Sequence, residues 1–513
     1  MVSFYLVYLI INTNLLLTMI MQSLFRLVKP FRLVFLFLLV TIASAVTAQE
    51  KPVPEKKMEV VKEPELDKKE PQLAETLPSK NQPPKQPSIK ESIDYLKKHP
   101  KEMEEILSDL IRTENAERLA LLLPAYQTVP GYDPSVIEWG NAIIAEQKGD
   151  MTTAIKLYRK INAALPKVIL LRFHLSRALY RDKQYEAAKF EFEKLRTEEI
   201  SNSDKEAIDD YIKEINEKDN WTFNGSLNYV SDPNVNNSSK KGTKMRLGNG
   251  VLTSPGPETA RGFSYALSAD KKWTQNNGRF VALHLGTNGL YYLNNKGYNE
   301  LNTDIGIGAG LGTARFDVEV GPYLQNRLYA SNDNGKLSQY SKNIGLRADM
   351  SYWITPQWRY QTLAKLSKDK YIKRYNRLDG GNHQWSNTLL YLANPEQYWY
   401  TGLDYGIKKA QEDFDSYQRL GLRFGWGQVW KNGLSSNLSV GFGQKKYAGA
   451  DPLFGSTKRQ DKEMDVGLSL WHRNIHFKGI TPRLTWQYHL TNSNQKLFDY
   501  DKHNFFVEFR KEF

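Results

Sequence analysis

From Trp221 to the C-terminus, apolar and polar residues alternate with a period of two in short units. One unit interleaves two sets of residues, the mainly apolar Tyr340, Ile344, Leu346, Ala348, Met350 and Tyr352 and the mainly polar Ser341, Asn343, Gly345, Arg347, Asp349 and Ser351. Successive side chains of a β-strand point to opposite faces, so each unit predicts a strand with one apolar face. The connections are alternately short, as at Thr355-Pro356, and long, as at 448–462. This combination is typical of a transmembrane β-barrel with lipid outside and water inside.

The predicted fold is α+β multidomain, with a fourteen-stranded antiparallel transmembrane β-barrel over residues 219–513. Counting back from Phe513 through the connections gives fourteen strands that begin near Thr243, and an even number is expected of such barrels. Trp221–Val230 is then either the first strand, with one unit miscounted later, or a segment that leads into the barrel. A soluble β-sandwich is the alternative, but sandwiches rarely sustain one-sided alternation over so long a stretch.

The last unit and the polar faces of the units carry the barrel's predicted functional residues. The C-terminal unit resembles the signal that the barrel-assembly machinery reads, although Lys511 interrupts its alternation; its residues are Phe505, Val507, Phe509 and Phe513. This machinery and outer-membrane lipid are therefore predicted partners. Charged residues predicted to face the lumen are Arg347, Asp349, Arg423, Arg483, Glu508 and Arg510. They either line a polar path or form internal ion pairs that plug the lumen.

Residues 91–218 have helical spacing and contain a repeat. At a spacing of 34 residues Ala188 aligns with Ala154, and Phe192 aligns with Tyr158, which is the period of tetratricopeptide repeats. A small residue is needed where two helices cross closely, and an aromatic residue fills the gap to the next repeat. The positions predicted to pack the repeats are Ala142, Gly149, Ala154, Tyr158, Pro166, Ala188 and Phe192. An ordinary helical bundle is the alternative.

The N-terminal residues predict export. Residues 1–48 are interpreted as a signal peptide with a start at Met21, because a basic region is followed by an apolar run and the small-residue pattern Val46-Thr47-Ala48. A transmembrane anchor is the alternative. Residues 49–90 are rich in Pro, Lys, Glu and Gln and predict a disordered linker. The expected location is the bacterial outer membrane, with the N-terminal domain in the periplasm.

The composition and the scattered polar residues predict no catalytic, metal-binding or cofactor-binding site. The chain has 70 Lys and Arg against 57 Asp and Glu, but the excess is spread along the sequence and an exported chain does not meet nucleic acid. It contains no Cys, which excludes disulfides, thiolate sites and acylation of an N-terminal Cys. His472 and His476 are four residues apart, a spacing that brings two ligands to one metal ion on a helix, but they lie in a strand region. Ser469 has no His and acidic partner in alternating register. We therefore predict no catalytic, metal or cofactor-binding residue.

The order of these features resembles a known family, the surface lipoprotein assembly modulators of the type XI secretion pathway. The resemblance covers about residues 105–513 and rests on the helical segment Leu170–Tyr180 with Tyr185-Glu186-Ala187-Ala188 and Phe192, and on Trp221 followed by Ser231-Asp232-Pro233-Asn234-Val235-Asn236. We assign Trp221, Asp232, Asn234, Val235 and Asn236 to a motif at the junction of repeats and barrel. The resemblance implies a periplasmic tetratricopeptide domain before a fourteen-stranded barrel. It also implies a client, a periplasmic lipoprotein or a secreted haem-binding protein for iron capture, that is moved to the cell surface.

Two other functions fit parts of the sequence. Exopolysaccharide export porins also pair tetratricopeptide repeats with a barrel, but they usually carry many more repeats. An outer-membrane hydrolase would need a Ser nucleophile and a His base near the membrane rim. The leading hypothesis remains a non-enzymatic translocator.

Overall fold

The computed structural model describes residues 58–60, 89–247, 250–275, 278–355, 357–394, 396–472, 475 and 481–512. The predicted signal peptide, its start at Met21, nearly all of the predicted linker and the terminal Phe513 lie outside the described residues. None of the described helices combines the length and the hydropathy that a membrane-spanning helix needs.

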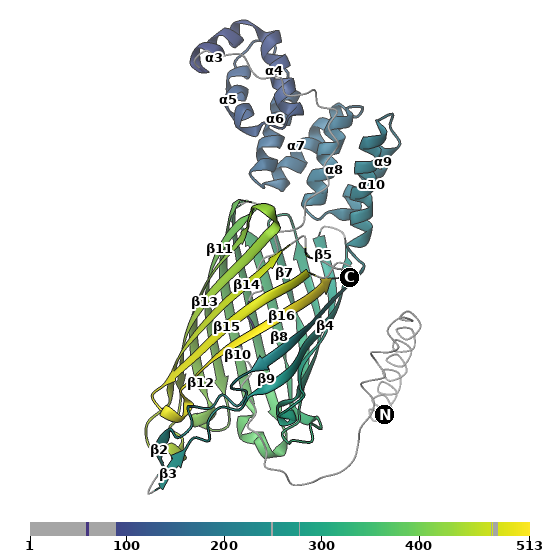
Figure 1. Ribbon diagram of the computed structural model, residues 1–513. Coiled ribbons are helices and arrows are strands. Elements are labelled where there is room, and N and C mark those ends of the chain that lie inside the picture. The colour runs from purple at the N-terminus through teal and green to yellow at the C-terminus, as the bar shows by residue number, and fades with distance from the viewer. Residues whose placement is uncertain are drawn as a thin grey trace, which may run out of the picture. The chain divides into compact units, whose positions relative to one another are not determined.

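The N-terminal described region is helical (Figure 1). Its helices are α3 (Ile89–Lys98), α4 (Pro100–Arg112), α5 (Ala116–Tyr126), α6 (Pro134–Gln147), α7 (Met151–Ala164), α8 (Ile169–Arg181), α9 (Tyr185–Arg196) and α10 (Asn202–Glu217). Four helices begin where a polar side chain accepts a hydrogen bond from a backbone N–H of the first turn, and these caps are Asn115, Asp133, Asp150 and Ser201. Helix α6 packs on α7, and α8 packs on α9.

The residues of the 34-residue repeat lie in the core of this helical region. Ala154 and Ala188 are fully buried in α7 and α9, and Tyr158 and Phe192 are fully buried one turn later. The ring of Phe192 stacks on that of Tyr211 of α10, with centroids 4.7 Å apart. Ala142 is also fully buried, whereas Gly149 ends the α6–α7 turn with φ +73°, a conformation that favours glycine. Pro166 follows α7 in the exposed turn before α8.

The C-terminal region is a closed antiparallel barrel of fourteen strands, as predicted. The strands are β1 (Trp221–Asp232), β4 (Ala260–Thr274), β5 (Arg279–Tyr292), β6 (Glu300–Gly312), β7 (Phe316–Tyr329), β8 (Ser338–Trp353), β9 (Trp358–Tyr371), β10 (Gly380–Asn394), β11 (Gln397–Lys409), β12 (Tyr417–Val429), β13 (Leu434–Tyr447), β14 (Gln460–His472), β15 (Thr481–Ser493) and β16 (Tyr500–Glu512). Strand β1 pairs with β4 on one side and with β16 on the other, which closes the barrel. At one end, here called the turn end, five of the six connections have two to four residues, whereas every connection at the other end, the loop end, has six or more.

Of the two alternatives for the start of the barrel, the structure has Trp221–Val230 in the first strand, and the count that began near Thr243 is wrong. The barrel begins with β1 at Trp221, which pairs with β4 along its whole length from Trp221–Lys271 to Asp232–Ala260. The segment after Thr243 instead forms β2 (Lys244–Leu247) and β3 (Gly250–Thr253), which pair only with each other. Each has four residues, whereas a strand needs about 9–11 to cross a bilayer. This hairpin belongs to the loop-end connection between β1 and β4 (Figure 1).

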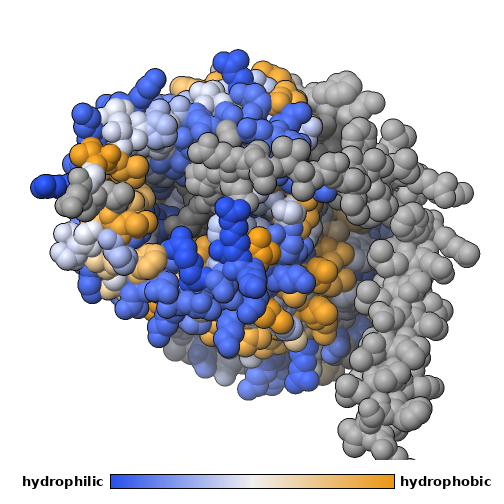
Figure 2. All heavy atoms as spheres, turned by 90° about the horizontal axis from the view of Figure 1, so that it is seen from below, coloured by the Kyte–Doolittle hydropathy of each residue, from blue (hydrophilic) through white to orange (hydrophobic). Residues whose placement is uncertain are grey.

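The two faces of the barrel wall differ as the alternation predicts. Leu346, Leu422 and Phe505 are exposed on the outer face, whereas Asp404 and Ser386 are buried on the inner face. Seen from the loop end, hydrophilic side chains crowd the rim while apolar ones show in patches on the wall (Figure 2).

Tyr340 departs from this alternation. We expected it on the apolar face with Ile344 and Leu346, but it is almost fully buried and its ring lies 5.4 Å from that of Tyr371 and 5.2 Å from that of Tyr375. The register between β7 and β8 shifts at Arg327–Leu328, opposite this point. A one-residue shift moves a side chain to the other face of a sheet, which explains the inward position of Tyr340.

Candidate functional site

The helical region holds a buried network of charges between its repeats. Glu146 of α6 accepts hydrogen bonds from Tyr158 Oη (2.8 Å) and from Arg177 Nε (3.1 Å). Arg177 of α8 also donates from Nη1 and Nη2 to both carboxylate oxygens of Glu114, at 2.7 and 2.8 Å. His174 is fully buried, and its Nε2 lies 3.3 Å from the same carboxylate. The network thus ties the turn after α4 to α6, α7 and α8.

This network shifts the pKa of Glu114 and that of Tyr158. Burial by itself raises the pKa of Glu114, but the hydrogen bonds and charges of His174 and Arg177 outweigh burial and hold that pKa well below its ordinary value. Burial raises the pKa of the Tyr158 hydroxyl, and the Glu146 carboxylate raises it further. The Glu114 carboxylate is therefore ionised at neutral pH, and its bonds to Arg177 brace the turn after α4 against α8. Sequence reasoning missed the network, although Arg177 and His174 lie on the buried face of α8.

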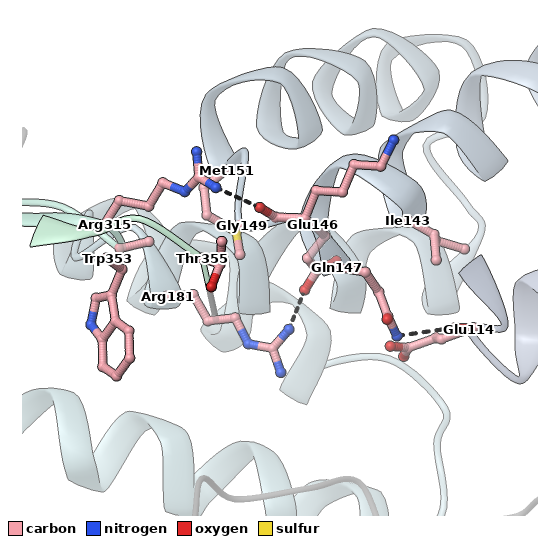
Figure 3. A pocket seen from close by; sticks show the side chains of 12 residues that line it. Glu114, Ile143, Glu146, Gln147, Gly149, Met151, Arg181, Arg315, Trp353 and Thr355 are labelled. Atoms are coloured by element: carbon pink, nitrogen blue, oxygen red, sulfur yellow. Dashed lines mark hydrogen bonds and ion pairs between the residues drawn. The ribbon is translucent and has the colours of Figure 1, made fainter. Parts of the chain in front are cut away.

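The helical region is attached to the turn end of the barrel. The connection between β6 and β7 reaches into the helical turns, where Arg315 Nη2 donates to the backbone oxygen of Lys148 at 2.7 Å. The Ala314 N–H donates to Asp182 at 3.3 Å, and Lys183 forms an ion pair with Asp317. A cleft lies beside this contact, between α6, α8 and the barrel turns (Figure 3); its lining includes Glu114, Glu146, Arg181, Arg315, Trp353 and Thr355.

A second attachment lies where the helices continue into the barrel. The carboxylate of Asp219, between α10 and β1, accepts the backbone N–H of Thr274 at 3.1 Å, and its backbone oxygen accepts from Lys271. Nearby, burial raises the pKa of the Tyr185 hydroxyl to about 12, and the carboxylates of Asp317, Asp219 and Glu214 contribute to the rise. Contacts at both attachments join residues far apart in sequence, so spacing alone could not reveal them.

The inner wall of the barrel carries hydrogen-bonded ion pairs between neighbouring strands. Arg423 of β12 donates from Nε and Nη2 to the two carboxylate oxygens of Asp404 on β11, at 2.6 and 2.9 Å. Its Nη2 also reaches Ser386 Oγ (2.9 Å) and Thr388 Oγ1 (3.1 Å) on β10. A side chain at Gly402 would collide with this guanidinium, because a Cβ there would lie 2.6 Å from Nη2. Such a bidentate pair is specific in geometry.

The other residues predicted to face the lumen are not brought into one site. Arg347 pairs with Asp349 on the same strand at 2.6 Å. Arg483 of β15 lies over the Trp471 ring, 4.0 Å from its centroid, and Glu508 stands opposite Arg483 in the β15–β16 register. The side chain of Arg510 lies outside the described part of the structure. Sequence reasoning missed further inward pairs, such as Arg419–Glu463 at 2.7 Å. This pair joins β12 to β14 across β13, so a comparison of adjacent units would not have found it.

The five residues grouped as a junction motif lie at the two ends of β1, which corrects that grouping. Trp221 begins β1 at the turn end, beside the helices, whereas Asp232 ends it at the loop end. Twelve residues at about 3.3 Å each separate these ends by roughly 40 Å. Asn234, Val235 and Asn236 instead shape the β1–β4 connection. Here Asn234 Oδ1 accepts from Ser238 N (2.9 Å), Asn236 Oδ1 accepts from Glu258 N (3.0 Å) and Val235 is buried.

The remaining candidates for chemistry have ordinary surroundings. Ser469 Oγ lies 3.0 Å from Thr485 Oγ1, and His476 lies outside the described residues. Over the described part of the chain, no group of three or more His, Cys, Asp or Glu side chains is placed to hold a metal ion. At the C-terminus, Phe505, Val507 and Phe509 are exposed on the outer face of β16.

Fold and contacts together define a class: a transmembrane β-barrel with a helical-repeat domain attached at its turn end. The surface lipoprotein assembly modifier family matches residues 221–513, and the N-terminal tetratricopeptide repeats of that family match residues 89–192. The chain belongs to this family, which confirms the resemblance and the tetratricopeptide-like fold. Barrel and family together indicate the bacterial outer membrane.

Relatives of the chain cover most of its length. Surface lipoprotein assembly modifier 1 of Haemophilus influenzae is 38% identical over 86% of this chain and 90% of its own. The surface lipoprotein assembly modifier of Pasteurella multocida is 33% identical over 82% of this chain and 85% of its own. A hemophilin secretion modulator of Acinetobacter baumannii is 23% identical over 77% of this chain and 82% of its own.

Proposed function

We propose that this chain is a non-enzymatic translocator that delivers particular lipoproteins, or related haem- and iron-capture proteins, from the periplasm to the cell surface. The helical domain receives the client in the periplasm, and the barrel provides the route outward. The observation that carries the proposal is the attachment of the helices to Arg315 and Asp317 at the turn end. It supports a periplasmic repeat domain, because short turns are expected on the periplasmic side of such barrels. The names of the relatives support both kinds of client.

Stacked helix pairs expose broad surfaces suited to protein segments. Apolar side chains that the helical domain leaves exposed include Tyr95, Leu121 and Phe190. They offer contacts for an unfolded or partly folded client. Without a nucleotide site in the sequence, the energy for transport comes from client folding or binding outside the cell.

Deletion of the gene tests the proposal directly. Surface lipoproteins of the deletion strain should lose their sensitivity to protease added to intact cells and regain it when the chain is restored. A barrel without the helical domain should restore less. Unchanged protease sensitivity of every surface lipoprotein in the deletion strain would contradict the proposed function.

The absence of Cys makes the orientation testable without background labelling. Single variants Leu121→Cys in α5 and Val251→Cys in β3 both replace exposed side chains. A membrane-impermeant maleimide should label Val251→Cys on intact cells, and label Leu121→Cys only after the outer membrane is opened. Labelling of Leu121→Cys on intact cells would place the helical domain outside and refute its role in client capture.

A further inference from the structure

Three residues of the N-terminal stretch that was predicted to be a linker lie inside the barrel. Glu59 Oε1 is 2.5 Å from Arg347 Nη1, and Glu59 Oε2 is 2.7 Å from Lys365 Nζ. The backbone N–H of Glu59 donates to Gln384 Oε1 at 3.4 Å. Beside it, Met58 Sδ lies 3.2 Å from the position that a Cβ on Gly406 would occupy. Glu59 is thus held through both carboxylate oxygens and its main chain.

These contacts belong to one continuous row across the barrel wall. Arg347 of β8 is the register partner of Lys365 of β9, which is the partner of Gln384 of β10, which is the partner of Gly406 of β11. The adjacent positions Leu346, Leu366, Trp385 and Tyr405 are exposed on the outer face. Successive side chains of a strand point to opposite faces of the barrel wall, so the four residues of the row point into the lumen at a single level.

The row carries two positive charges, on Arg347 and Lys365, which favour a bound anion. The Lys365 side chain is only 12% exposed, and its ammonium lies 4.5 Å from the centroid of the Tyr323 ring. Among the described residues, Glu59 is the carboxylate that pairs with Lys365, whereas Arg347 also has Asp349. A largely buried ammonium without an anionic partner is costly, so the row is built for a carboxylate.

We propose that Arg347, Lys365 and Gln384 form a carboxylate-binding site in the lumen, and that Glu59 occupies it so that Met58–Val60 is an internal plug of the barrel. The site takes an acidic side chain of an extended peptide: two cations grip the carboxylate and the Gln384 amide oxygen accepts the main-chain N–H. One consequence rests on the proposed function. A client in transit must displace Glu59, and an acidic side chain of the client can take its place on the same cations.

Cysteine cross-linking tests the position of the plug in the full chain. In Met58→Cys/Gly406→Cys, a short bismaleimide or mild oxidation should join the two thiols. Cross-linking is measured as the loss of both thiols that a polyethylene-glycol maleimide can label. The matched control is Met58→Cys/Leu403→Cys, because Leu403 is on the same strand but on its exposed outer face. Adding Glu59→Gln to the first pair should lower its cross-linking several-fold.

Single-channel conductance in planar bilayers gives a second readout that needs no client. Glu59→Gln should conduct more than the unaltered chain, and Glu59→Gln/Lys365→Gln should add little, since the two groups act as a pair. The barrel of each variant is first shown to be folded by its heat-modifiable mobility on gels. Cross-linking of Met58→Cys/Gly406→Cys no greater than that of the control, or equal conductance with and without Glu59, would overturn the plug. Neither result would bear on lipoprotein delivery.

Discussion

The helical domain and the barrel bury opposite kinds of residue. In the helices, Tyr158 and Phe192 are fully buried, whereas in the barrel Leu346 and Phe505 are exposed and Asp404 is buried. The helical domain needs an apolar core because its surroundings are water. The barrel has lipid outside and places its polar groups inward, where they must satisfy one another. An exposed leucine therefore faces water in the helical domain and lipid in the barrel.

The largest effect is expected in the helical core. Phe192→Ala removes a fully buried ring that packs on Tyr211, and such a change costs about 3–5 kcal/mol. The helical circular-dichroism signal should melt at lower temperature, while the barrel keeps its heat-modifiable mobility. The control is Phe190→Ala on the same helix, whose side chain is 57% exposed and whose loss should change the melting temperature little. Equal effects of the two variants would contradict the core assignment.

The next effect separates the two surroundings through two leucines of equal exposure. Leu346 in β8 and Leu121 in α5 are 54% and 53% exposed. Leu346→Arg puts a charge toward lipid near the middle of a strand and should destabilise the barrel by about 2–4 kcal/mol. The arginine of Leu121→Arg points into water, so this variant should leave the stability nearly unchanged. The measurement is the urea midpoint of barrel unfolding in detergent or liposomes. A neutral Leu346→Arg would mean that this face does not meet lipid.

A smaller effect concerns acid stability of the helical domain alone. The folded-state pKa of Glu114 is depressed, so its ionised form stabilises the fold above the unfolded value of about 4.5. This contribution should be lost as the pH falls from that value toward the folded pKa. Thermal melts of the helical signal between pH 7 and pH 3 should show a shallower pH dependence for Glu114→Gln. Glu117→Gln, on the exposed first turn of α5, should keep the dependence of the unaltered chain.

The smallest effect is expected where the two regions meet. Lys183 and Asp317 form an ion pair that is about one-third exposed on each side, and such pairs contribute about 0.2–1 kcal/mol. A double-mutant cycle with Lys183→Gln and Asp317→Asn, read by the melting of the helical signal, should give a coupling in this range. A coupling well above it would show that the barrel strongly stabilises the helical domain.

Local periodicity in the sequence determined the two kinds of structure. Alternation around Leu422 and Phe505 predicted membrane-facing strands, and the spacing of Ala154 and Ala188 predicted stacked helix pairs, because these patterns report which face of an element is apolar. Arg347, Asp349 and Arg423 were likewise expected on the polar face. Which strands pair was beyond this reasoning, so the start of the barrel at Trp221 stayed one of two alternatives and the inward position of Tyr340 was not predicted.

The tertiary structure alone decided which polar groups meet. Arg177 bonds Glu114 across 63 residues, Arg347 reaches Glu59 across 288, and Arg315 contacts Lys148 across 167. Each of these contacts depends on how elements stack or on which strands become neighbours when the barrel closes, and no short-range pattern encodes that choice. The sequence by itself determined a helical-repeat domain followed by a membrane barrel. Closure of the barrel and packing of the repeats decided which charged residues of the chain form pairs, because these ion pairs need distant segments brought within hydrogen-bond distance.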